Sequence, residues 1–289
     1  MTKLFGLGTA LVTPFDKQGA VDFEALDRVL DVQLDGKVDY IVVLGTTGEA
    51  VTLTPDEHRA VRQHVVEYVA GRVPLVLGLG GNNTAEVLRK LDEWKDELTA
   101  HYAAILSVCP YYNKPTQEGL FRHFDTIAKA SPIPVILYNV PGRTGVNMLP
   151  ETVMRIYEAN PTKIGGVKEA SGNIDQIKTL ITMAAQTDLA VISGDDGIAC
   201  ELMQAGAVGL ISVASNAWPK EFGRIVHEKD AALQKQFDET IRLLFKDGNP
   251  AGIKTVLALQ GRIENVLRLP LVPCSEAVQN ELAQILQKK

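Results

Sequence analysis

The sequence contains few cysteines, no CxxC pair and no long apolar run. Its three cysteines, Cys109, Cys200 and Cys274, are an odd number and lie far apart among the 289 residues. We therefore expect neither a disulfide framework nor a structural zinc site. No apolar stretch reaches the ~18 residues that a membrane-spanning helix needs, and the first residues lack the small-residue cleavage site of a signal peptide. These absences predict a reduced, cytoplasmic globular protein with no membrane partner.

Basic residues are also fewer than acidic residues. Lys and Arg number 29 against 35 Asp and Glu, which gives a net charge of −6 at pH 7. A nucleic-acid-binding protein needs a basic surface, so nucleic acid is not an expected partner. His58 and His64 do not have the i, i+4 spacing of a helical metal pair, and no metal site is predicted. The glycine-rich segments 78–81 and 248–255 match neither a dinucleotide fingerprint nor a Walker A motif, so neither NAD nor ATP is predicted.

Short apolar segments alternate with longer amphipathic ones along a chain that is 46% hydrophobic. The apolar segments are rich in Val, Ile and Leu, which is typical of strands buried on both faces of a parallel sheet. Eight are present, at residues 8–13, 40–44, 75–79, 103–108, 135–138, 164–168, 190–193 and 208–213. Residues 54–57 and 173–176 have the capping residues of helix starts, and Pro55 suits a first helical position.

Eight strand–helix units predict an α/β protein with the (β/α)₈ TIM-barrel fold. An open doubly wound sheet is the alternative, but closure leaves no exposed strand edge and suits eight evenly spaced units better. From about Lys229 the strand pattern stops, and residues 231–245, 250–259 and 275–286 are typical of three helices. We expect a catalytic barrel over residues 1–228 and a C-terminal helical domain over residues 229–289.

In such a barrel the chemistry lies at the C-terminal ends of the strands. The second strand ends in GTTGE at 45–49, where main-chain N–H groups and the Thr46 and Thr47 hydroxyls can hold a carboxylate or phosphate. An ordinary Gly/Thr turn is the alternative interpretation.

Lys168 closes the sixth predicted strand. A buried amine must find a partner or become neutral. A neutral amine can attack a ketone and form a Schiff base. The alternatives are a salt bridge to Glu169 and an amine that reaches solvent along its own aliphatic stem.

Two further segments follow neighbouring strands. Tyr138 ends the fifth strand, where it can donate and accept a proton beside Lys168, and Arg143 in the next loop offers a bidentate fork for a carboxylate. A rim tyrosine and a solvated arginine are the alternatives. Tyr111 and Tyr112 follow the fourth strand, and paired aromatics often mark an interface. Local packing of their loop is the alternative.

Five motifs run in order over essentially the whole chain: GTTGE at 45–49, CPYYNKPTQEG at 109–119, YNVPGRTG at 138–145, GVKEASG at 166–172 and SGDD at 193–196. Together they resemble the dihydrodipicolinate synthase family, pyruvate-dependent class I aldolases related to N-acetylneuraminate lyase. The arginine of YNVPGRTG and the tyrosine pair resemble the synthase branch more than the sugar-acid lyases. The resemblance implies a lyase that condenses pyruvate with L-aspartate 4-semialdehyde to 4-hydroxy-tetrahydrodipicolinate, in diaminopimelate and lysine biosynthesis.

The resemblance also implies roles for single residues. Lys168 would form the Schiff base with pyruvate, and Tyr138 would shuttle protons during imine formation and ring closure. Thr47 and Tyr112 would complete a hydroxyl relay with Tyr138, with Tyr112 contributed across a dimer interface.

Substrate binding is implied in the same way. The main-chain N–H groups of Thr46 and Thr47 would hold the pyruvate carboxylate, and Arg143 would bind the carboxylate of the semialdehyde. Gly194 and Ile211 would line the pyruvate pocket.

The family resemblance further implies a homotetramer built as a dimer of dimers, with no metal or organic cofactor. Many members are inhibited by L-lysine, and the matching positions here are His58, Asn82, Glu86 and Tyr111. The sequence departs from the family at Ala50, where Ser is frequent, and at Pro55, where His is frequent. The alternative for Glu86 is a favourable position near the positive end of a helix.

Two other functions stay open on the sequence alone. A lyase or aldolase acting on a 2-keto-3-deoxy sugar acid, such as N-acetylneuraminate, would also trap pyruvate, so only turnover with each substrate separates it from the synthase. A non-catalytic barrel that binds a small acid would form no covalent adduct, and the change Lys168→Ala would then matter little.

Overall fold

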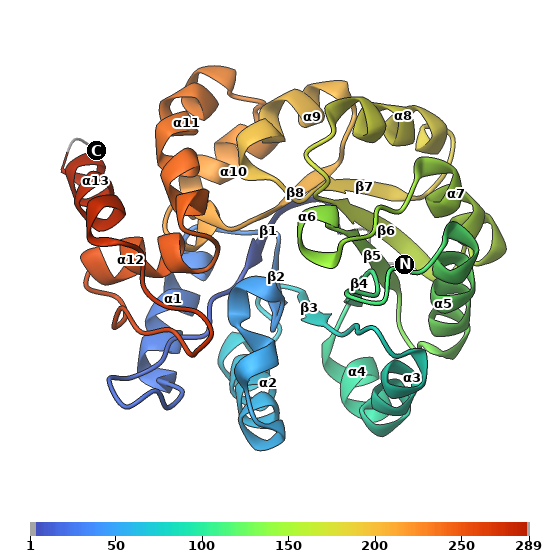
Figure 1. Ribbon diagram of the computed structural model, residues 1–289, viewed down its shortest axis with the longest axis horizontal. Coiled ribbons are helices and arrows are strands. Elements are labelled where there is room, and N and C mark those ends of the chain that lie inside the picture. The colour runs from blue at the N-terminus through green and yellow to red at the C-terminus, as the bar shows by residue number, and fades with distance from the viewer. Residues whose placement is uncertain (1–3, 288–289) are drawn as a thin grey trace. The chain divides into compact units, whose positions relative to one another are not determined.

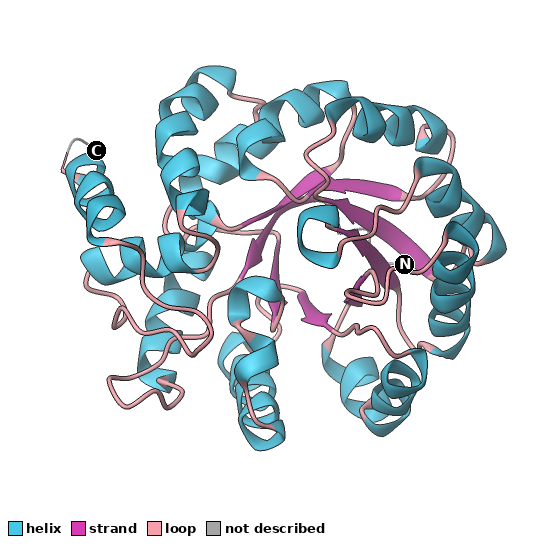
Figure 2. Cartoon of the chain, viewed as in Figure 1, coloured by secondary structure: helices cyan, strands magenta, loops and turns pink. Residues whose placement is uncertain are grey.

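Eight parallel strands form a closed barrel in the order β1 to β8 in this computed structural model, which describes residues 4–287 (Figures 1 and 2). The strands are β1 (Gly6–Ala10), β2 (Tyr40–Val43), β3 (Leu75–Gly78), β4 (Ala104–Val108), β5 (Val135–Asn139), β6 (Ile164–Glu169), β7 (Ala190–Ser193) and β8 (Gly209–Ser212). The TIM-barrel prediction is confirmed, and the open doubly wound sheet is wrong, because a closed sheet has no edge strand.

The chain packs as two compact units, of which the first comprises residues 4–6 and 74–211. It carries β3 to β7, most of β8, and the helices α3 (Thr84–Glu93), α4 (Lys95–His101), α5 (Gln117–Ala130), α6 (Pro141–Thr144), α7 (Pro150–Ala159), α8 (Ile174–Ala184) and α9 (Ala199–Ala205). Helix α5 packs against α3 and α7, and α8 packs against α7 and α9. In Figure 1 α5, α7 and α8 lie along the outer side of the strands β4 to β7.

The strands of the first unit are apolar because both of their faces are covered. Every residue of β5 and β7 is buried. Helix α8 turns the side chains of Ile177 and Leu180 inward, and α5 does the same with Phe124 and Ile127. This is the burial that the continuous Val/Ile/Leu runs predict for a parallel sheet.

The second unit comprises residues 7–73 and 212–287. It contains β2, β1 after its first residue, and the helices α1 (Phe23–Asp35), α2 (Pro55–Val69), α10 (Pro219–His227), α11 (Ala231–Lys246), α12 (Ala251–Leu259) and α13 (Glu276–Leu286). The last three helices pack against one another. The three predicted C-terminal helices are therefore confirmed, and the domain boundary at residues 228 and 229 stays a prediction.

The predicted helix starts are also confirmed. The Thr54 hydroxyl accepts from the Glu57 N–H at 3.2 Å, and the Glu57 carboxylate accepts from the Thr54 N–H at 2.9 Å, with Pro55 at the first helical position of α2. Asn173 caps α8 by accepting from the Gln176 N–H at 3.1 Å. Both starts satisfy helix N–H groups that have no partner within the helix.

The first strand differs from its prediction, because β1 covers Gly6–Ala10 and not residues 8–13. Beyond Ala10 the Asn216 side chain replaces a strand neighbour. Its Oδ1 accepts from the Val12 N–H at 3.1 Å, and its Nδ2 donates to the Ala10 carbonyl at 2.8 Å. The apolar run therefore extends past the strand because a buried amide satisfies its main chain.

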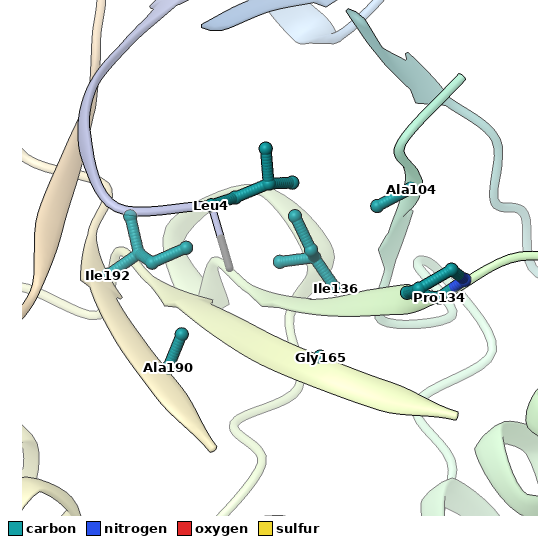
Figure 3. Close-up of a pocket in the computed structure, with 7 residues that line it drawn as sticks. All are labelled: Leu4, Ala104, Pro134, Ile136, Gly165, Ala190 and Ile192. Carbon is teal, nitrogen blue, oxygen red and sulfur yellow. The ribbon is translucent and has the colours of Figure 1, made fainter. Parts of the chain in front are cut away.

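A small apolar pocket lies near the starts of four strands in the first unit (Figure 3). It is lined by Leu4, Ala104, Pro134, Ile136, Gly165, Ala190 and Ile192. None of these side chains can donate, accept or titrate, so the pocket contributes packing and no reactive side chain. Among residues 4–287 no helix has the length and apolar character to cross a membrane. The same residues contain no cluster of His, Cys, Asp or Glu arranged for a metal ion.

Candidate active site

Strand register places the two most informative residues of the first unit opposite each other. Tyr138 pairs with Lys168, and Asn139 pairs with Glu169, across parallel β5 and β6. Because side chains alternate along a strand, the first pair lies on one face of the sheet and the second pair on the other. Tyr138 and Lys168 are only 7% and 6% exposed, and the Lys168 Nζ lies 4.4 Å from the centre of the Tyr138 ring.

The Lys168 amine therefore faces an aromatic ring. Within the described residues it has no ion pair with Glu169, whose carboxylate bonds to other groups, and its burial leaves little contact with solvent. The interpretation as a salt bridge to Glu169 is wrong, and the 6% exposure of Lys168 argues against a solvated amine. A buried amine beside a phenol, without a bound carboxylate, has the surroundings that a Schiff-base lysine needs.

Gly194 follows β7 and borders this amine directly. A Cβ atom at Gly194 would lie 2.9 Å from the Lys168 Cε and 2.7 Å from the Ala170 Cβ, closer than such atoms approach. The Gly194 N–H donates to the Glu169 carbonyl at 2.7 Å, which fixes the approach. The structure thus brings Gly194 to Lys168, while the pocket-lining role that the family resemblance implies for Gly194 stays a prediction. Ile211 is buried in β8, and its lining role stays a prediction.

Arg143 lies on the short helix α6, directly after β5. Its side chain is exposed, and the loop around it is fixed by the Thr144 hydroxyl, which donates to the Val146 carbonyl at 2.9 Å. The Thr144 carbonyl in turn accepts from the Tyr112 N–H at 3.2 Å. The loop that carries the tyrosine pair is thereby attached to the loop that carries the arginine.

Tyr112 itself adopts an unusual conformation. Its φ is +73°, in the left-handed region that bulky residues rarely adopt, and its side chain is 89% exposed. Local packing of the loop therefore does not explain Tyr112, because 89% exposure leaves the ring little contact with its own loop. A strained, exposed aromatic is typical of a residue held for a role outside the local chain.

The four residues of the predicted lysine site are divided between the two units. Asn82, Glu86 and Tyr111 belong to the first unit and His58 to the second. Asn82 donates to the Tyr111 carbonyl at 3.1 Å, so these two lie together in the first unit. The Glu86 carboxylate is exposed and accepts from Arg89 at 2.8 and 3.0 Å, and these bonds lower its pKa. It also lies in the first turn of α3, as the alternative interpretation expects. His58 is on α2 in the second unit, where its Nδ1 lies 2.7 Å from an Arg62 nitrogen.

GTTGE forms a turn in the second unit in which Thr47, Gly48 and Glu49 are buried and Thr46 is exposed. Residues Thr46–Gly48 make a single 3₁₀ turn, and Glu49 after it has a φ of 50°. The Gly48 carbonyl accepts from the Thr13 hydroxyl at 2.7 Å, and the Thr47 hydroxyl accepts from the Asn249 Nδ2 at 3.0 Å. These bonds to distant residues mean that the turn is more than a surface connection, and they leave the Thr47 hydroxyl able to donate.

A buried ion pair next to this turn was missed by sequence reasoning. Lys254 of α12 and Glu49 form a salt bridge in which both side chains are fully buried. The Lys254 ammonium also donates to the Val266 carbonyl at 3.0 Å and lies 4.1 Å from the Phe15 ring centre. Burial lowers the pKa of Lys254 to about 8, and Glu49 opposes that change. A lone lysine within the apolar run 251–259 was the available signal, since a buried cation needs an anion.

Arg268 completes this cluster. Its main-chain N–H donates to the Glu49 carboxylate at 3.1 Å, and its guanidinium donates to the Glu57 carboxylate at 2.7 Å. The Arg268 bonds hold the pKa of Glu57 down at about 2. No sequence pattern indicated this residue, because its partners lie 211 and 219 positions away.

Comparison with known proteins gives a consistent result. The model of the dihydrodipicolinate synthetase family matches residues 3–289. A relative named 4-hydroxy-tetrahydrodipicolinate synthase, from Parabacteroides distasonis, is 48% identical over 99% of this chain and 97% of its own. The chloride-inhibited dihydrodipicolinate synthase of Acinetobacter baumannii, solved with pyruvate, has a TM-score of 0.92 and 38% identity, covering 98% of each chain. The lysine-bound enzyme of Cyanidioschyzon merolae has a TM-score of 0.92 and 34% identity, covering 99% of this chain and 98% of its own.

Proposed function

The chain belongs to the dihydrodipicolinate synthetase family, and from that premise we propose that it condenses pyruvate with L-aspartate 4-semialdehyde. The product is 4-hydroxy-tetrahydrodipicolinate, and one water is released. The enzyme is a lyase of diaminopimelate and lysine biosynthesis. The observation that carries the proposal is Lys168, buried at the end of β6 with its amine against the Tyr138 ring.

Lys168 is the nucleophile of the proposed reaction. Its neutral amine adds to the pyruvate ketone, and loss of water leaves a protonated imine. The imine withdraws electrons, so the methyl carbon loses a proton and the resulting enamine attacks the aldehyde carbon. The amino group of the semialdehyde then adds to the imine carbon, closes the ring and releases the Lys168 amine unchanged.

Tyr138 is the proposed proton shuttle for the imine and ring-closure steps. Its position beside Lys168 supports this role, because a general acid or base must lie within reach of the proton that it moves. We propose Thr47 and Tyr112 as the rest of the hydroxyl relay. The Thr47 hydroxyl accepts from Asn249 and can still donate, which suits a relay group.

The two substrate carboxylates have separate proposed sites. The main-chain N–H groups of Thr46 and Thr47 hold that of pyruvate, and Gly194 and Ile211 line the pocket around it. Arg143 binds the carboxylate of the semialdehyde through its planar fork. The exposed position of Arg143 on α6 suits a group that must meet an incoming substrate.

We propose a homotetramer, formed as a dimer of tight dimers, with Tyr112 reaching the active site of the partner subunit. The strained backbone and 89% exposure of Tyr112 support this, because the ring has little contact with its own loop. We also propose a cytoplasmic protein that needs no metal or organic cofactor. Residues 1–228 would form the catalytic barrel and residues 229–289 the C-terminal domain.

L-Lysine is a proposed inhibitor, bound near Asn82, Tyr111, Glu86 and His58. The bond between Asn82 and Tyr111 supports the first two positions. Glu86 would have to exchange Arg89 for the lysine ammonium, which its exposure permits. Inhibition by millimolar lysine that disappears in Asn82→Ala supports the proposal, and an unchanged rate with lysine contradicts it.

Coupled turnover tests the function most directly. Purified protein with pyruvate and aspartate semialdehyde should release product, and cleavage of N-acetylneuraminate should not occur. The variant Arg143→Ala should raise the KM for the semialdehyde by about 100-fold, because a bidentate charged contact is lost. Trapping of pyruvate by borohydride should persist in this variant. Cleavage of a sugar acid without semialdehyde turnover would replace the synthase with the sugar-acid lyase.

A further inference from the structure

A buried hydrogen-bond network lies on the sheet face opposite Tyr138 and Lys168. At its centre the Asn139 Nδ2 donates to both Glu169 carboxylate oxygens, at 3.0 and 3.2 Å. The carboxylate also accepts from the Ser171 N–H at 2.9 Å, and both side chains are fully buried. Because Asn139 and Glu169 immediately follow Tyr138 and Lys168, this pair is the outer counterpart of the inner pair.

The network also binds the loop that carries Arg143. The Asn139 Nδ2 donates to the Asn147 Oδ1 at 2.8 Å, and the Asn139 Oδ1 accepts from the Met148 N–H at 3.0 Å. Residues 140–148 therefore leave β5 at Asn139 and return to the side chain of the same residue. One amide thus closes the loop on itself, which limits the positions that Arg143 on α6 can take.

Helix α8 supports the far side of the same loop. Asn147 and Gln176 exchange two bonds, since the Asn147 Nδ2 donates to Gln176 at 2.7 Å and the Gln176 Nε2 donates to Asn147 at 3.1 Å. The Gln176 Nε2 also lies 3.4 Å from the Glu169 carboxylate. Gln176 is itself fixed, because its N–H is bound by the Asn173 cap at the start of α8.

The donors around Glu169 suit a carboxylate and no other side chain of similar size. Burial raises the pKa of Glu169, and the bonds from Asn139, Ser171 and Gln176 oppose that rise. A glutamine there would turn an NH₂ group toward groups that are themselves donors. A buried polar network of this kind is useful only when every member is satisfied, because a lost bond leaves an unpaired group in an apolar surrounding.

We propose that Asn139, Glu169 and Asn147 are positioning residues for the two halves of the reaction. Glu169 orients the end of β6 and with it the Lys168 amine. Asn147 holds the loop that presents Arg143 to the second substrate. Asn139 bonds to both and couples them. This inference rests on the proposed function, since it assigns one branch to imine formation and the other to recognition of the semialdehyde.

Three variants and one matched control separate the branches. Asn147→Ala should raise the KM for aspartate semialdehyde about tenfold and leave pyruvate trapping by borohydride unchanged, because only the loop is released. Glu169→Gln should slow trapping about tenfold, because a small displacement of the amine costs near-attack geometry. Asn139→Ala should show both effects.

The control is Asn160→Ala. Asn160 is also a buried asparagine of the first unit, and its Nδ2 donates to Asp125 at 2.9 Å and to the Ile156 carbonyl at 3.2 Å. Its loss should lower the Tm and leave both kinetic readouts at wild-type values. If Asn147→Ala and Glu169→Gln behave like this control, the network is structural only and the proposal is wrong.

The same experiment distinguishes failure of the inference from failure of the function. Wild-type protein that traps pyruvate but does not turn over the semialdehyde would overturn the synthase and the Asn147 branch together. Slower trapping in Glu169→Gln would still support the Glu169 branch in that case. If Glu169→Gln does not fold, Gln176→Ala removes the donor that lies 3.4 Å from Glu169 together with both bonds to Asn147. Its effect on the Glu169 branch is then judged by the trapping rate alone, which Asn147→Ala should leave unchanged.

Discussion

Two lysines are buried among residues 4–287, and their surroundings differ in one decisive respect. Lys254 in the second unit is fully buried against the carboxylate of Glu49. Lys168 in the first unit is 6% exposed, and its amine lies against the Tyr138 ring, while the neighbouring Glu169 is bound by amides and a main-chain N–H. A buried cation beside a carboxylate is held in place, and a buried amine without one is available for chemistry.

The comparison shows that burial alone does not identify a reactive lysine. Burial lowers the pKa of Lys254 to about 8, yet its salt bridge and its bond to the Val266 carbonyl occupy the ammonium. A lowered pKa taken alone would thus have selected Lys254. What separates the two is the direction in which the nearest carboxylate points.

The largest expected effect tests whether Lys168 alone is reactive. Borohydride reduction with pyruvate should add mass to the peptide that contains Lys168 and to no other lysine peptide. Lys168→Ala should remove the adduct and lower kcat by roughly 10³-fold or more, because the covalent step is lost. Peptide mass spectrometry and the coupled assay measure these outcomes. Adduct on Lys254 would break the comparison.

The second prediction concerns stability and the buried pair. Glu49→Gln should destabilise the protein by about 3–5 kcal/mol, because it leaves the Lys254 ammonium without its carboxylate. The double variant Glu49→Gln with Lys254→Met should recover part of that loss, because no uncompensated charge remains. Urea unfolding of the wild type, of Glu49→Gln, of Lys254→Met and of the double variant gives the coupling free energy. If Glu49→Gln and the double variant lose the same unfolding free energy, the ion-pair interpretation is contradicted.

A third prediction acts on Lys168 through its neighbour. Gly194→Ala places a Cβ within 3 Å of the Lys168 Cε, so the amine must move. We expect pyruvate trapping to slow by about 10–100-fold, because near-attack geometry is lost. The Tm should fall as well, because the new Cβ also lies 2.7 Å from the Ala170 Cβ. The control is Gly223→Ala, because a Cβ atom there would have no neighbour within 4 Å, and it should leave trapping unchanged. Gly172→Ala is unsuitable as a control because Gly172 has a φ of +69°, where any side chain is strained.

The smallest expected effect is a pH dependence that belongs to Lys254. Its pKa lies at about 8 in the fold against 10.5 ordinarily, so between these values the unfolded chain binds more protons than the folded one. Stability should therefore rise with pH from 8 to 10.5 by the contribution of this group, and that contribution should be absent in Lys254→Met. The unfolding free energies of the wild type and of Lys254→Met, measured from pH 8 to 10.5, give this contribution as their difference. A wild-type stability that falls with pH relative to the variant would contradict the stated direction.

Much of the fold follows from the sequence, because buried parallel strands require continuous apolar runs. Seven of the eight predicted strands overlap the observed ones closely, whereas β1 is displaced because Asn216 satisfies the main chain beyond Ala10. Lys168 and Tyr138 could be placed together because strand ends determine the position of side chains in a barrel, whereas Gly194 was indicated only by the family resemblance.

The supporting groups could not be found in the same way. Glu49 contacts Lys254 and Arg268 from more than 200 positions away, and no local pattern encodes that distance. The sequence did suggest Glu169 as a partner of Lys168, which is wrong because adjacent residues of a strand point to opposite faces. The left-handed backbone of Tyr112 could not be predicted from the sequence either, since most residues with that conformation are glycine or asparagine.

The opposite orientations of Lys168 and Glu169 also constrain how this protein can change over evolutionary time. Deleting or inserting one residue between Gly166 and Lys168, where the register with β5 is regular, would turn the carboxylate inward and the amine outward. Loops elsewhere in the chain can lengthen without that exchange. The length of this one strand is therefore as strictly constrained as the identity of the lysine at its end.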